Sequence, residues 1–80
     1  MTDEQQSRAL EAERLLNDTT LRDAIASMRM EALERLATLD ATATDEIREA
    51  QSIVRVADGL VLTLQQFVAA GRAPTKRAVA

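Results

Sequence analysis

The feature that most constrains this chain is an apolar row in its C-terminal half, with members alternately three and four residues apart. The row consists of Ile47, Ala50, Val54, Ala57, Val61, Leu64 and Val68, and we call it the seam. This spacing is typical of a helix that packs lengthwise against other helices. A second row repeats every seven residues beside it and contains Ile53, Leu60 and Phe67. The pattern predicts a long helix covered by protein along its length, and it identifies no reaction.

The length of the chain limits how it can be stabilised. Its 80 residues form at most one domain, and a domain this small buries a small fraction of its surface. There is no cysteine for a disulfide and no histidine, so we expect neither a metal site nor a cofactor. The remaining ways to stabilise such a domain are oligomerisation and docking on a larger partner.

Helix-breaking residues are rare, which predicts an all-α fold. Gly59, Gly71 and Pro74 are the only glycines and the only proline. We expect three helices, at about 3–16, 19–39 and 45–70, and no strands. The third helix should continue through Gly59 and end with Gly71 as its C-terminal cap.

Polar residues mark where the second and third helices begin. Asp18 is the preferred N-cap of the second helix, with Thr20 and Asp23 as a weaker capping-box alternative. Thr44 is the expected N-cap of the third. Because both connections are short, successive helices should lie antiparallel, as a helical hairpin or small bundle that is oligomeric. Residues 1–71 would form the domain and 72–80 a flexible basic tail, with the first helix and the tail peripheral.

The second helix has an unusually wide apolar face, spanning an arc of about 200° at 100° per residue. A face this wide can contact two neighbours. Arg22 and Arg29 lie within it, and we expect them to form ion pairs with acids on a neighbouring helix or subunit. The predicted partner interface comprises Leu21, Arg22, Ile25, Met28, Arg29, Ile53, Val54, Leu60, Val61, Leu64, Phe67 and Val68.

Candidate catalytic groups are few. Nucleophilic catalysis requires a nucleophile beside a base, and neither cysteine nor histidine is present. Arg22 and Arg29 share a helix face, as do Arg48 and Arg55. Small three-helix chorismate mutases hold a dicarboxylate with helix-borne Arg and Lys, and this chain resembles them in length and helix count. It departs from them in its shorter first helix and in lacking an interior lysine. We therefore expect a protein that is not an enzyme and has no small-molecule substrate.

The charge distribution argues against a folded nucleic-acid surface. Residues 1–70 carry 7 basic and 13 acidic residues, a net charge of −6, whereas residues 71–80 carry three basic ones. Any contact with nucleic acid would then be weak and would be made by the basic tail. The acidic N-terminus does not resemble a signal peptide, and no apolar run approaches the roughly 20 residues of a membrane span. We expect no membrane contact, and a protein that is cytosolic or is assembled into something made in a cytosol.

One resemblance covers most of the chain. The stretch 12–18 (AERLLND), the following Leu21 and the stretch 50–60 (AQSIVRVADGL) resemble small helical proteins encoded among the head genes of tailed bacteriophages and prophages. In such proteins proline often follows the Asp, where this chain has Thr19. The resemblance implies a capsid-associated or head-assembly protein that acts in many copies, as a homo-oligomer or on a larger phage structural protein. The alternative is a small acidic regulator or inhibitor that docks on a host or phage enzyme.

The seam generates a direct test. Val61→Asp should disrupt association and folding, because it places an unpaired charge in an apolar contact. The measurements are the thermal unfolding midpoint and the mass in solution. If both stay unchanged, the seam is misassigned.

Overall fold

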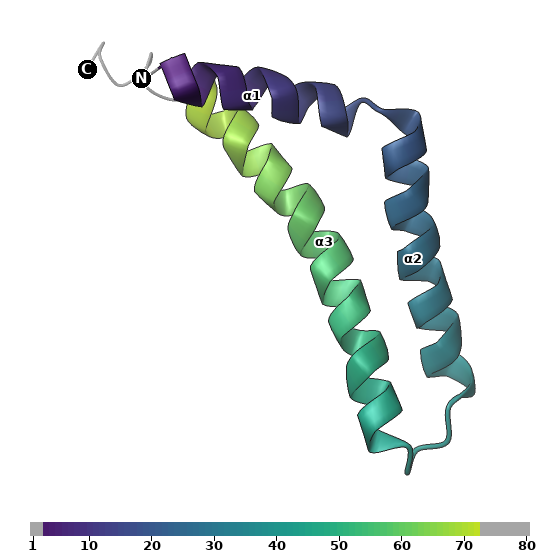
Figure 1. The fold of residues 1–80 in the computed structure, drawn as a ribbon. Helices are drawn as coiled ribbons and strands as arrows, with labels where there is room; N and C mark the ends of the chain where they lie inside the picture. The colour runs from purple at the N-terminus through teal and green to yellow at the C-terminus, as the bar shows by residue number, and fades with distance from the viewer. Residues whose placement is uncertain (1–2, 73–80) are drawn as a thin grey trace.

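The computed structural model describes residues 3–72, and within this range the chain is helical apart from short connections (Figure 1). Helix α1 spans Asp3–Leu16, α2 spans Thr19–Thr38 and α3 spans Thr44–Arg72, with no strand among these residues. The predicted all-α fold of three helices is therefore confirmed. The second helix is one residue shorter than expected, and the third is longer at both ends.

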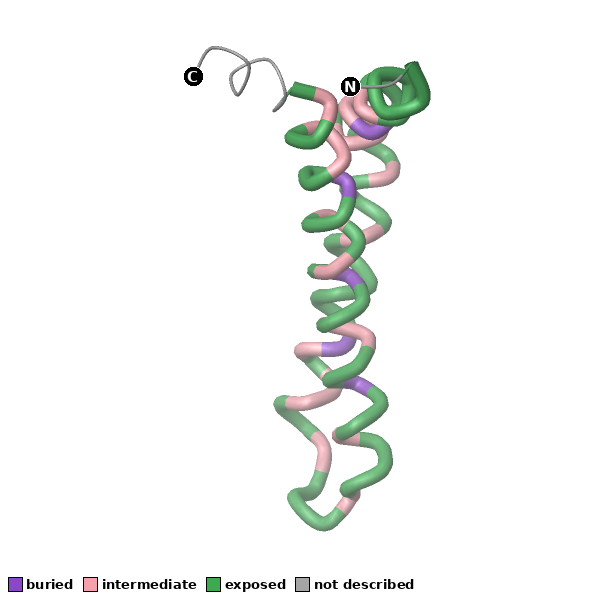
Figure 2. The backbone as a smooth tube through the Cα atoms, turned by 90° about the vertical axis from the view of Figure 1, so that its left-hand side faces the viewer, coloured by how far each residue is buried: buried purple, intermediate pink, exposed green. Residues whose placement is uncertain are grey.

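Helix α3 is the element on which the other two pack. Helix α1 lies across the C-terminal end of α3. Helix α2 packs beside the N-terminal part of α3 and diverges from it toward α1, and α1 and α2 barely contact each other (Figure 1). Viewed from the side, α2 and α3 overlie one another in a narrow column (Figure 2). The molecule measures 55 × 27 × 17 Å. Since one helix with its side chains is about 10–12 Å across, the helices form little more than a single layer.

The core of this layer is thin and made of small side chains. Within residues 3–72 the buried positions are Ala12, Ala32, Ala50, Ala57 and Leu64. Three of them belong to the seam, and the other four seam residues are half-buried. The seam thus faces the other helices, and its alanines allow the helices to approach closely.

The start of α2 follows the sequence prediction. The Asp18 carboxylate accepts a hydrogen bond from the backbone N–H of Leu21, at 3.0 Å, which makes Asp18 the N-cap. At the other end, Leu39 is the C-cap and its N–H donates to the carbonyl of Arg35, at 2.9 Å. Both ends of α2 are therefore fixed by contacts between residues close in sequence.

The connection between α2 and α3 is held by Asp40. Its carboxylate accepts hydrogen bonds from the backbone N–H and the hydroxyl of Thr42, at 2.9 and 2.7 Å. These two bonds hold the pKa of Asp40 below its ordinary value, and the bond from the backbone N–H has the larger effect. The predicted N-cap at Thr44 is wrong, because the N–H of Ile47 donates to the carbonyl of Ala43 and places Thr44 in the first turn.

The predicted C-terminal cap at Gly71 is also wrong. Helix α3 passes through Gly71 and includes Arg72, and no described glycine has a positive φ. The role of Gly71 is packing, since a Cβ at this position would clash with the Cβ of Ala9 on α1. Arg72, assigned to the tail from the sequence, belongs to α3, and its Nη2 lies 3.1 Å from Oε2 of Glu13. The rest of the predicted tail, 73–80, lies outside the described residues.

The expectation that the first helix is peripheral is wrong as well. Helix α1 contacts α3 at Gly71 through Ala9, and it buries Ala12. The guanidinium of Arg8 lies over the ring of Phe67, 5.1 Å from its centroid. The contact was not expected because the first two turns of α1 contain little apolar surface to bury, and the small residues Ala9 and Ala12 mediate it.

The two described glycines allow a matched test. Helix α3 continues through Gly59 as predicted, and a Cβ there would meet nothing within 4 Å. Gly59→Ala should therefore stabilise the fold by about 0.5–1 kcal/mol, the helix-propensity difference. Gly71→Ala should destabilise it by about 1–3 kcal/mol, because α1 must move away. Urea unfolding measures the change in the free energy of unfolding for each variant. Equal changes of the same sign would contradict this packing.

Candidate partner interface

One face of the helical layer carries a row of apolar side chains that the helices of residues 3–72 leave partly or largely exposed. It consists of Ile53, Val56, Leu60 and Phe67 on α3 and Met28 on α2, and we call it the apolar strip. Val56 is 66% exposed, Met28 52% and Leu60 44%, whereas Ile53 and Phe67 are half-buried. Met28, Ile53 and Val56 line one open hollow.

The strip follows from the helical spacing of α3. The strip residues of α3 share one side of the helix, beside the seam, because they are spaced by three or four residues. The positions are 53, 56, 60 and 67, with Thr63 filling the gap between the last two. The seam points at α1 and α2 within the layer, which leaves the strip facing out of it. Because the layer is about one helix thick, none of the helices in residues 3–72 covers this side.

At one end of the strip, α1 and α3 form a second open hollow. Arg8, Ala12 and Leu15 of α1 and Leu64 and Phe67 of α3 are among the residues that line it. Because the Arg8 guanidinium lies over the Phe67 ring, this end of the strip carries an exposed positive charge.

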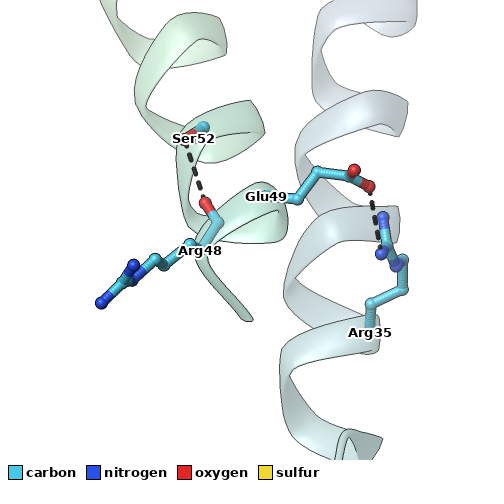
Figure 3. Close-up of polar contacts among 4 residues, drawn as sticks. All are labelled: Arg35, Arg48, Glu49 and Ser52. Atoms are coloured by element: carbon cyan, nitrogen blue, oxygen red, sulfur yellow. Dashed lines mark hydrogen bonds and ion pairs between the residues drawn. The ribbon is translucent and has the colours of Figure 1, made fainter. Parts of the chain in front are cut away.

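The other end of the strip carries an ion pair between α2 and α3 (Figure 3). Glu49 extends from α3 toward α2, where its Oε1 lies 3.4 Å from Nη2 of Arg35. The Arg48 side chain points away from α2, and its backbone carbonyl accepts a hydrogen bond from the Ser52 hydroxyl, at 2.9 Å. The Glu49 side chain is 68% exposed, so the pair contributes at most about 1 kcal/mol and leaves the carboxylate free to meet a further cation.

The opposite face of the layer is more polar where α2 meets α3. Arg29 Nε donates to the Asp58 carboxylate at 2.8 Å, which is the ion pair with a neighbouring helix expected for Arg29. Arg22 is exposed. Leu62, 54% exposed, lies on α3 near Asp58 by helical phase, about 120° or more around the helix from Val56.

The predicted interface residues divide into two groups in the structure. Those that contribute to packing inside the chain are buried or half-buried, namely Leu21, Ile25, Val54, Val61, Leu64 and Val68. Those that lie on the strip are Met28, Ile53, Leu60 and Phe67. The sequence analysis did not select Val56, the most exposed member, because it lay off both rows. The spacing 49, 53, 56, 60, 63, 67 was the signal that could have found it.

The described residues offer no metal centre. Within residues 3–72 no three acidic side chains gather closely enough to hold an ion. Asp40, in the connection between α2 and α3, has a lowered pKa because of its bonds to Thr42 and lies away from the strip. The chemistry of this face is therefore that of apolar contact with charges at its two ends.

Helix α3 is more apolar than the sequence analysis allowed. It is long and apolar enough to cross a membrane by length and composition alone, with a mean hydropathy of 1.4 over an 18-residue window. Arg55 and Asp58 lie near the middle of this helix, and a charge at the centre of a bilayer costs about 2.5–3.5 kcal/mol on insertion scales. The same apolarity is found in helices that are covered by protein.

Comparison with protein-family models, curated proteins and solved structures finds no match to this chain.

Proposed function

We propose that this chain is a non-enzymatic assembly protein that acts through helix-mediated protein–protein association. In this proposal α2 and α3 form an antiparallel hairpin that exposes the apolar strip, and α1 packs against the C-terminal end of α3. The observation that carries the proposal is the exposure of Val56, Met28 and Leu60 on one face of the layer. A row of large apolar side chains left in water is typical of an interaction site.

The biological setting that we propose is the head of a tailed bacteriophage. It rests on the resemblance of residues 12–18 and 50–60 to proteins encoded among phage head genes. A capsid-associated or head-assembly factor acts in many copies, in the virion or in the host cytoplasm, and contacts its own copies or a larger structural protein. The alternative function is that of a regulator that is monomeric and docks on an enzyme through the same face.

The mass of the purified chain separates these two functions. Light scattering over a wide range of protein concentrations should give an oligomer, and Val56→Glu should shift it toward monomer because a buried charge opposes apolar contact. Leu62→Glu, an equally radical change at a similarly exposed site on another side of α3, should leave the mass unchanged. A chain that stays monomeric at every concentration contradicts the assembly function and favours the regulator.

A further inference from the structure

We propose that the apolar strip is covered by the same strip of a second copy, with the two α3 helices antiparallel about a two-fold axis near residue 58. This proposal rests on the proposed function and specifies the partner and the geometry of association. In a two-fold contact the same surface patch serves both copies, so it must be complementary to itself. Two independent features of the strip, its spacing and its terminal charges, meet that condition.

The spacing of the strip is symmetric about its centre. The positions on this side of α3 are 49, 53, 56, 60, 63 and 67, with steps of four, three, four, three and four, and the pattern reads the same in both directions. Antiparallel pairing then places Val56 against Leu60 of the other copy, and Ile53 against Thr63. Repeats of this kind pack side by side as in a helical bundle. The two most exposed apolar positions of the α3 strip thereby cover each other.

The contact between position 49 of one copy and position 67 of the other favours the antiparallel orientation. Glu49, which also pairs with Arg35, lies at one end of the strip. Arg8, stacked on Phe67, lies at the other end, in a hollow that Glu4 and Glu11 also line. An antiparallel pair brings Glu49 of each copy beside Arg8 of the other, twice per dimer. A parallel pair would instead place Glu49 beside Glu49 and Arg8 beside Arg8, and like charges in contact across an interface are unfavourable.

A lipid surface fits this face less well. Glu49, Glu31 and Glu11 border the hollows that contain the strip. The net charge of −6 over residues 1–70 also opposes approach to anionic membranes, which attract basic segments. A second copy supplies both the apolar cover and the opposite charge at each end.

The geometry allows a test by charge exchange. Positions 49 and 67 are about 27 Å apart along α3 at 1.5 Å per residue, so Glu49 and Arg8 interact only between copies. Arg8→Glu and Glu49→Arg should each weaken self-association about tenfold, since each places two like-charge contacts in the dimer. Mixing the two variants in equal amounts should restore association, because both contacts of the mixed dimer are then oppositely charged. The double variant should associate like the wild type.

Sedimentation equilibrium measures the self-association constant of the two single variants, their mixture and the double variant, alongside the wild type. Circular dichroism verifies that each variant keeps its helix content. Arg55→Glu, the same change at an exposed site on another side of α3 from the strip, is the matched control and should associate normally. Association of the wild type without recovery in the mixture would overturn the pairing geometry and leave the assembly function standing. A wild type that is monomeric would overturn both. A monomer that co-sediments with phosphatidylcholine vesicles, and loses this on Val56→Glu, would identify the strip as a lipid-binding face instead.

Discussion

The structure depends on the close approach of α3 to the other two helices at small residues. Ala12 and Gly71 let α1 cross its C-terminal end, and Ala32, Ala50 and Ala57 let α2 lie along the rest. Alanine buries one methyl group, worth about 0.8 kcal/mol, whereas ordering a residue costs about 1–2 kcal/mol. Contacts of this kind fix the geometry of the helices well and contribute little apolar burial. The larger aliphatic side chains that could contribute more are left half-buried or exposed.

This thin core explains why the interface and the fold are connected. A single layer of helices has two free faces, and the face with the apolar strip exposes several large apolar side chains together, whereas Leu10, Met30 and Leu62 are exposed outside the strip. Covering Val56, Leu60 and Met28 would add large side chains to a core that now contains Leu64 as its only buried large residue among positions 3–72. Self-association would therefore add stability that the isolated chain lacks, which is a common solution for domains of this size.

The sequence predicted well what depends on neighbours along the chain. Asp18 was identified as a cap because capping joins residues three apart, and the continuity of α3 through Gly59 followed from the lack of other breakers. The failures involve residues far apart in sequence. Gly71 was predicted to be a C-terminal cap, but it packs against Ala9 of α1. The contact between Arg8 and Phe67 joins residues near opposite ends of the chain and could not be predicted from local spacing. Val56 was missed because it lies off the two predicted rows, and although its spacing places it on one side of α3 with Ile53 and Leu60, which side the other helices leave open depends on the packing.

The central claim is that the fold gains stability when a second copy covers the strip. The most direct measurement is the midpoint of thermal unfolding, followed by circular dichroism at increasing protein concentration. If unfolding is coupled to dissociation, the midpoint rises with concentration, as mass action requires. A midpoint that stays constant across the whole range would show that one copy is stable by itself, and would contradict this account.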